Sequence, residues 1–116
     1  MITVKLTKEH RGINSTTFTG RPQGKEVRVN LGLSILDSSN ENVYVEIPEG
    51  TTSFNPSFYL GLFYDSILYL NGLDAFKKKY EIIYADHDVE VVDLLKDNIK
   101  DCERQAAREF KRKSKV

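Results

Sequence analysis

The stretch from Val43 to Ile67, VYVEIPEGTTSFNPSFYLGLFYDSI, constrains the fold more than any other part of the chain. Val43 to Ile47 has the pattern of a short buried strand, and Pro48 and Gly50 end it. The segment from Pro56 to Asn71 predicts a helix, because Pro suits the first helical position and Asn55 or Ser53 can cap it. This helix is apolar almost all round, so we expect it to be buried. Gly72 ends it.

A second strand is predicted from Lys79 to Ala85, with Ile82 and Ile83 inside. Two strands separated by a buried helix are typical of a parallel pair joined by a right-handed crossover. We therefore expect an α/β fold in which helices pack on a small mixed sheet.

The remaining elements are read from periodicity. Ile2, Val4 and Leu6 alternate with polar residues and predict a strand. Residues 10–24 are polar and glycine-rich and predict a loop, with a short strand near residues 16–18. Lys25 to Leu36 fits both a strand and a helix, and β-branched valines with Gly32 favour the strand.

A long final helix is predicted after Asp86 or Asp88, either of which can cap it. Its apolar stripe consists of Val89, Val92, Leu95, Ile99, Cys102 and Ala106. The stripe fades after Phe110, so we expect one domain over residues 1–110 and a frayed basic tail over residues 111–116.

The charge balance bears on the class of partner. The chain of 116 residues has 17 basic and 17 acidic side chains, which argues against a dedicated nucleic-acid binder. No apolar run approaches the length of a membrane span, and no secretory signal is visible at the N-terminus. The single cysteine, Cys102, cannot form an internal disulfide, and these features together favour a cytoplasmic setting.

Four hydroxyl residues, Thr51, Thr52, Ser53 and Ser57, lie at the predicted start of the central helix. A helix N-terminus presents unpaired N–H groups and a positive dipole end. Hydroxyls there can help to hold a phosphate, can accept one covalently, or can simply cap the helix. The sequence leaves these three roles open.

Two segments resemble the STAS-like domains of unknown function found in bacteria and their phages, relatives of anti-sigma-factor antagonists. Members of that family read roughly SGExFRxxLLxPxL and then VxVDLDGTxGYGSSFLEEAFGGLxR. The chain has QGKEVRVNLGLSIL from Gln23 to Leu36, followed by the stretch already described. The matching positions are Gly24, Arg28 and Leu31 in the first segment and Gly50, Thr51, Ser57, Phe58 and Phe63 in the second.

The resemblance covers about Thr19 to Ala106 and implies a helix over Lys25 to Leu36. It also implies a phosphorylatable hydroxyl where a partner docks, with Ser57 the counterpart and Ser53 and Thr52 close behind. The implied partner is another protein, such as a histidine-kinase-like ATPase or a host defence factor. The family's paired carboxylates are replaced by Tyr59 and Leu60 or Gly61, so their role does not carry over.

Other groups of residues are assigned plainer roles. Asp86-His87-Asp88 caps a helix better than it binds a metal, because zinc sites need three or four convergent ligands. We expect no metal and no cofactor. Cys102 belongs to the apolar stripe and is expected in the core rather than as a nucleophile.

Two basic groups remain candidates for contacts with phosphate or an acidic partner. Arg11, Arg21 and Arg28 are expected in a flexible loop, and the C-terminal group is Arg104, Arg108, Lys111 and Arg112. The sequence as a whole favours a non-catalytic, protein-binding regulatory module that docks through the hydroxyl-rich turn. The alternatives are a nucleic-acid-associated protein that uses the basic groups, or a phosphate- or nucleotide-binding protein.

Overall fold

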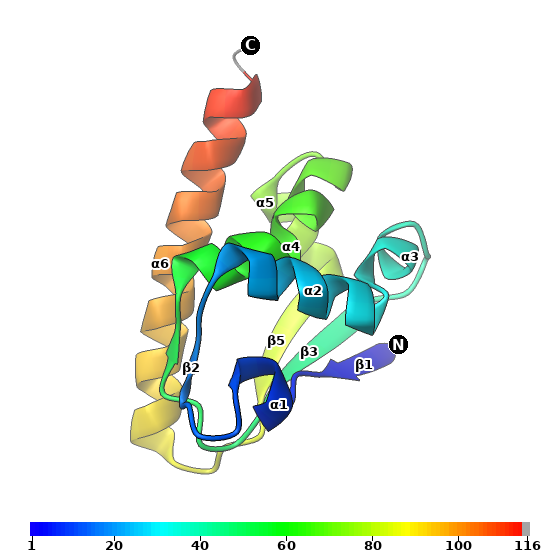
Figure 1. Ribbon diagram of the computed structural model, residues 1–116. Helices are drawn as coiled ribbons and strands as arrows, with labels where there is room; N and C mark the ends of the chain where they lie inside the picture. The colour runs from blue at the N-terminus through cyan, green and yellow to red at the C-terminus, as the bar shows by residue number, and fades with distance from the viewer. Residues whose placement is uncertain (115–116) are drawn as a thin grey trace.

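The structure is a computed structural model that describes residues 1–114. It is an α/β fold built from short parallel strands and helices of very different length (Figure 1). In chain order the elements are β1 (Ile2–Lys5), α1 (Lys8–Arg11), β2 (Thr17–Phe18), α2 (Arg21–Leu31), α3 (Leu33–Asp37), β3 (Val43–Ile47), β4 (Ser53–Phe54), α4 (Pro56–Tyr69), α5 (Leu73–Lys79), β5 (Tyr80–Tyr84) and α6 (Val89–Ser114).

The main sheet has the order β1-β3-β5, and every described strand pair in it is parallel. The predicted parallel pairing of β3 with β5 is confirmed, with Val43 opposite Tyr80 and Ile47 opposite Tyr84. A second sheet pairs β2 with β4, also in parallel. The expectation of a mixed sheet was wrong, because each return to the sheet passes through a helical connection.

The ambiguous segment from Lys25 to Leu36 is helical, as the resemblance implied and against the strand propensity. Val27 is buried whereas Val29 is 81% exposed, so the apolar residues follow a helical rather than an alternating period. Gly32, with φ of 69°, adopts the left-handed conformation that ends α2 and begins α3.

Helices α2 and α4 pack against each other at close range through Gly24 and Gly61. A Cβ atom on Gly24 would lie 2.3 Å from the carbonyl oxygen of Phe58, and one on Gly61 would lie 2.1 Å from that of Arg21. Only glycine permits two helix backbones to approach this closely. The contact fixes where the first turn of α4 lies relative to α2.

The core is centred on α4, as its composition predicted. Phe58, Leu62, Phe63 and Ile67 are each at most 1% exposed. Pro56 is the first helical residue, and the side chain of Asn55 accepts a hydrogen bond from the Ser57 N–H. A chain of ring contacts runs from Phe18 through Phe54, Tyr59 and Phe63 to Phe76, and the ring of Phe58 contacts those of Phe18 and Phe54.

Helix α6 is capped by Asp88, whose Oδ1 accepts hydrogen bonds from the backbone of Glu90 and Val91. Leu95, Ile99, Cys102 and Ala106 are buried, but Val89 is 71% exposed, so its placement on the stripe was wrong. The first turn of α6 extends past the core, which leaves Val89 without a packing partner in it. The helix continues through Ser114, beyond the predicted boundary at Phe110, and residues 115–116 of the predicted tail lie outside the described residues.

The predicted loop over residues 10–24 is shorter than expected. His10 and Arg11 complete α1, and α2 begins at Arg21 with Pro22 in its first turn. The short strand is confirmed as β2. In the described part of the chain, no helix is long and apolar enough to cross a bilayer.

Candidate functional site

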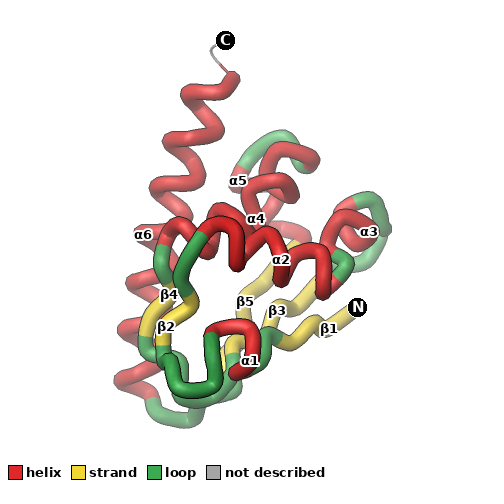
Figure 2. The backbone as a smooth tube through the Cα atoms, viewed as in Figure 1, coloured by secondary structure: helices red, strands yellow, loops and turns green. Residues whose placement is uncertain are grey.

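The segment after β1, which contains α1 and the loop that follows it, gathers with the loops after β3 and β5 at one end of the main sheet (Figure 2). This arrangement follows from parallel pairing, since the carboxyl ends of parallel strands share one edge of the sheet. Thr51 and Thr52 of the hydroxyl-rich turn belong to this group of loops. We call residues 12–16, 48–52 and 85–88 the loop surface.

Arg11 ties two of these loops together. Its Nε donates to the carbonyl oxygen of Ser15 at 2.6 Å, and its Nη1 donates to Oγ1 of Thr51 at 2.7 Å. A longer bond of 3.4 Å joins Nη1 to the carbonyl oxygen of Glu49. Arg11 therefore lies in a folded segment and links the loop after α1 to the loop after β3, whereas we expected it in a flexible loop.

Asp86 links the third loop, residues 85–88, to the loop after β3. Its Oδ2 accepts from the backbone N–H of Gly50 at 3.0 Å, and its Oδ1 accepts from that of Asp88 at 2.9 Å. These backbone hydrogen bonds, that of Asp88 first, lower the pKa of the Asp86 carboxyl below its usual value. The acidic group of the Asp86-His87-Asp88 motif thus holds loops in place.

The four predicted hydroxyls have different environments. Thr51 is fully buried, and its hydroxyl donates to the carbonyl oxygen of Pro48 at 2.8 Å while accepting from Arg11. Thr52 is exposed, and its hydroxyl lies 2.8 Å from Oγ1 of Thr16. Thr52 is consequently the hydroxyl of the turn that another protein can reach most directly.

Ser53 and Ser57 lie farther along the chain and are partly buried. Ser53 belongs to β4. The Ser57 hydroxyl donates to Oδ1 of Asn55 at 2.6 Å and accepts from the Gly20 N–H at 3.2 Å. Ser57 therefore supports the cap of α4 and links it to the start of α2.

The other two arginines of the expected basic loop lie elsewhere. Arg21 forms a two-pronged ion pair with Glu109 of α6, at 2.9 and 3.2 Å, and lies over the Tyr64 ring. The hydrogen bond from Arg21 lowers the pKa of the Glu109 carboxyl. The prediction of one flexible basic loop was wrong, because Arg21 and Arg28 lie on a helix and are committed to carboxylates.

Arg28 belongs to a buried polar network that the sequence did not reveal. Its Nη2 lies 2.5 Å from Oδ2 of Asp37, and its Nη1 donates to Oγ of Ser66 at 2.7 Å. Oδ1 of Asp37 accepts from Ser66 at 2.6 Å and from the Tyr80 hydroxyl at 2.5 Å. The network joins α2, α3, α4 and β5, and no spacing rule connects residues so far apart in sequence.

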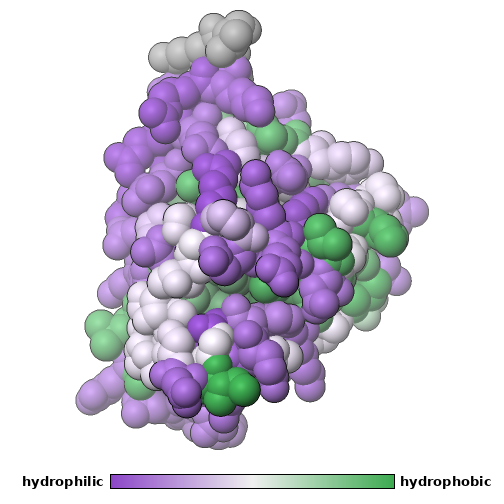
Figure 3. All heavy atoms as spheres, in the orientation of Figure 1, coloured by the Kyte–Doolittle hydropathy of each residue, from purple (hydrophilic) through white to green (hydrophobic). Residues whose placement is uncertain are grey.

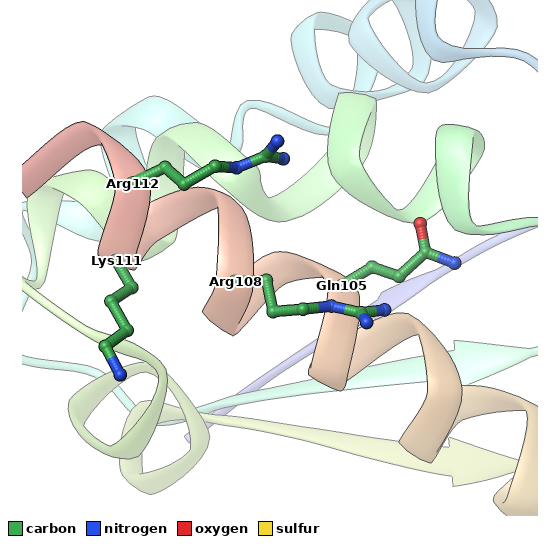
Figure 4. A pocket seen from close by; sticks show the side chains of 4 residues that line it. All are labelled: Gln105, Arg108, Lys111 and Arg112. Carbon is green, nitrogen blue, oxygen red and sulfur yellow. The ribbon is translucent and has the colours of Figure 1, made fainter.

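The C-terminal basic group lies on α6. Arg104 pairs with Asp101 one turn earlier. Gln105, Arg108, Lys111 and Arg112 line a surface hollow of about 470 Å³, and Figure 4 shows their side chains projecting from the last turns of the helix. Three cations at one hollow make a surface to which an anion can bind.

Cys102 is fully buried, and its thiol donates to the carbonyl oxygen of Phe54 at 3.4 Å. Burial raises the pKa of the Cys102 thiol to about 12, which keeps it protonated and unreactive at neutral pH. The expectation that Cys102 lies in the core is confirmed. Within the described residues, no three His, Cys, Asp or Glu side chains converge as metal ligands.

Comparison with known proteins gave no family model, curated protein or solved structure that matches this chain.

Proposed function

We propose that this protein is a small, non-catalytic regulatory module of STAS-like type that binds another protein through the loop surface. The proposal includes a right-handed crossover between β3 and β5 and a cytoplasmic setting. The sequence resemblance supports a histidine-kinase-like ATPase or a host defence factor as the partner.

The observation that carries the proposal is the preformed loop surface. Arg11 and Asp86 hold its three loops by side-chain hydrogen bonds, so little ordering remains to be done on binding. Its exposed residues include Ile13, at 73% of its surface, and Thr52. An exposed apolar side chain and an exposed hydroxyl can supply an anchor and a polar contact.

Thr52 is the residue through which binding would be regulated. Phosphate there adds roughly −1.5 to −2 charges at neutral pH to an exposed position. Thr52 is exposed and its hydroxyl bonds, among the described residues, only to Thr16, whereas the less exposed Thr51 and Ser57 use their hydroxyls in bonds to Arg11, Asn55 and Gly20. The family's counterpart, Ser57, is therefore assigned the structural role in this proposal.

The test uses photo-crosslinking with a matched control. A photoreactive amino acid is placed at Ile13 or at Ile35, which is equally exposed at 74% but lies on α3. Each protein is irradiated in an extract of its native host, and adducts are identified by mass spectrometry. We expect one discrete adduct from position 13 that excess unlabelled wild-type protein abolishes. The same adducts from both positions would contradict the proposal.

A charge variant then tests the regulation. Thr52→Asp should weaken capture of that partner, whereas Ser34→Asp, an exposed serine in the first turn of α3, should not. An uncompensated charge at a desolvated interface costs several kcal/mol, of the order of 2–5. Both variants should retain the wild-type circular dichroism spectrum. If Thr52→Asp captures the partner as well as the wild type does, Thr52 does not lie in the interface.

The hollow on α6 supports a second candidate, the binding of nucleic acid by the C-terminal basic group. The two arginines on α2 are engaged in ion pairs, so this candidate rests on the arginines that line the hollow, Arg108 and Arg112. The expected signature is an affinity for a single-stranded oligonucleotide that falls steeply between 50 and 200 mM salt. Arg108→Gln with Arg112→Gln should then flatten the salt dependence. Fluorescence anisotropy without saturable binding would exclude this candidate.

A further inference from the structure

A groove runs between strand β5 and helix α6, and its lining includes no residue of the loop surface. It has a volume of about 370 Å³. Its strand side carries Tyr80, Ile82 and Tyr84, and its helix side carries Lys96, Ile99 and Lys100. Figure 1 shows α6 beside the sheet on the side of β5. Helix α6 packs on α4 and β4, which leaves the space next to β5 open.

Strand β5 is an edge strand of the main sheet, since its only strand neighbour among the described residues is β3. The N–H of Ala85 donates to the carbonyl oxygen of Ile47, so Ala85 faces β3. In a parallel ladder alternate residues face the same neighbour, so Glu81 and Ile83 also face β3. The backbone N–H and C=O groups of Ile82 and Tyr84 therefore point away from it, toward the open edge.

The polar groups of the groove favour a negatively charged occupant. Lys77 is engaged with Glu103 at 3.3 Å. Lys96 and Lys100 form no ion pair with the described residues, and Lys96 lies 5.9 Å from the centroid of the Tyr84 ring. Against these two lysines the groove offers one further carboxylate, that of Glu81.

We propose that the β5–α6 groove binds an extended, acidic peptide segment of a partner protein, which adds to β5 as a fourth parallel or antiparallel strand. Main-chain hydrogen bonds to Ile82 and Tyr84 would supply the affinity common to strand addition. Alternate side chains of the peptide would reach the tyrosine rings on one face and Lys96 and Lys100 on the helix side. The proposal does not depend on the loop surface being a docking site.

The probe is a blocked synthetic peptide, acetyl-Asp-Val-Glu-Val-Asp-Val-Glu-amide, which alternates acidic and β-branched residues. Amide hydrogen exchange of the full chain gives a residue-level readout. Without peptide, Ile82 and Tyr84 should exchange faster than Glu81 and Ile83, because only the latter pair donates to β3. With peptide at ten times its Kd, the exchange of Ile82 and Tyr84 should slow about tenfold. Slowing confined to other amides would overturn the proposal.

Two peptide controls separate strand pairing from charge attraction. The first carries lysine in place of every acidic residue and should bind at least about tenfold more weakly. The second is a pair of peptides N-methylated at one or the other set of alternate residues. Since a strand pairs through one edge only, one methylated peptide should lose binding and the other should keep it. Equal binding of both methylated peptides, or of the lysine peptide, would refute strand addition of an acidic segment.

A pair of protein variants tests the lysines. Lys96→Glu with Lys100→Glu should lower the affinity for the acidic peptide about tenfold or more and should raise that for the lysine peptide. Lys8→Glu with Lys25→Glu changes the net charge equally at exposed sites on α1 and α2 and should leave both affinities unchanged. If Ile82 and Tyr84 become protected as protein concentration rises without peptide, the occupant is a second copy of this chain, and the acidic-peptide assignment fails.

Discussion

Two buried tyrosines allow the energy of one hydrogen bond to be measured within the same core. Tyr80 is 4% exposed and its hydroxyl donates to Asp37 at 2.5 Å. Tyr59 is fully buried and its hydroxyl has no partner among the described residues. Replacing either residue by Phe removes one oxygen atom and leaves the ring in place.

The two substitutions should therefore have different effects on stability. A hydrogen bond to a charged group contributes about 1.5–3 kcal/mol. Asp37 keeps its bonds to Arg28 and Ser66 when Tyr80 is changed, so we expect a loss near the lower end, about 2 kcal/mol, for Tyr80→Phe. Tyr59→Phe removes a hydroxyl that was desolvated without compensation, so the free energy of unfolding should stay unchanged or rise by up to about 1 kcal/mol.

The assay is urea unfolding of the wild type and both variants, followed by far-ultraviolet circular dichroism. With equal slopes, the midpoints report the differences in free energy directly. Equal losses for the two variants, or a larger loss for Tyr59→Phe, would refute the assignment of the hydrogen bond to Tyr80 and of the unpaired hydroxyl to Tyr59.

Further predictions concern the core, the helix contact, alkaline pH and the C-terminus. Phe63→Ala should destabilise the protein by about 3–5 kcal/mol in urea titration, and a loss below about 1 kcal/mol would place α4 at the periphery. Gly61→Ala should cost about 3 kcal/mol or more, because its Cβ would lie 2.1 Å from a backbone oxygen of α2; a wild-type midpoint would contradict the close contact. The raised pKa of Cys102, about 12, keeps the folded thiol protonated, so its contribution to stability is present below the unfolded pKa of about 8.5 and is lost as pH rises through the folded value. The urea midpoint should fall from about pH 9 toward pH 12, and Cys102→Ala should reduce that slope; an unchanged slope would assign it to other groups. Truncation after Phe110 removes the exposed side chains of Lys111, Arg112 and Lys113 and should lower the melting temperature by no more than a few degrees, which calorimetry would check.

Local sequence patterns were sufficient to predict the elements whose own residues determine their secondary structure. Strand β3 and helix α4 follow from a short apolar run, a breaker and a proline at the first helical position, and Asn55, one of the two predicted caps, caps the helix. Segment 25–36 differs, because its apolar residues fit both periods. What makes it helical is tertiary: Gly24 must meet the backbone of α4, and Arg28 must reach Asp37. Propensity is a weak prior where such contacts compete with it.

Long-range contacts also decided the roles of the residues in the candidate site. The sequence grouped four hydroxyls at the start of α4, and that grouping alone could not assign them different roles. Thr51 is buried because Arg11, 40 residues earlier, donates to it, and Thr52 remains outside. The sequence analysis also placed Arg28 in a flexible loop, since no local signal shows that it will pair with the buried carboxylate of Asp37. Long-range partners therefore decide which polar residues are available for binding.

The buried network and the loop ties have a joint consequence for β5. At its start, the hydroxyl of Tyr80 is bonded to Asp37, which Arg28 holds from α2. Just past its end, Ala85 donates to β3 and Asp86 accepts from Gly50. Removing one member of a buried ion pair is strongly destabilising, because the other charge is left uncompensated, so this anchoring resists local opening. An edge strand fixed at both ends keeps its free backbone groups aligned, and this alignment is the condition under which an incoming strand can pair without first ordering its template.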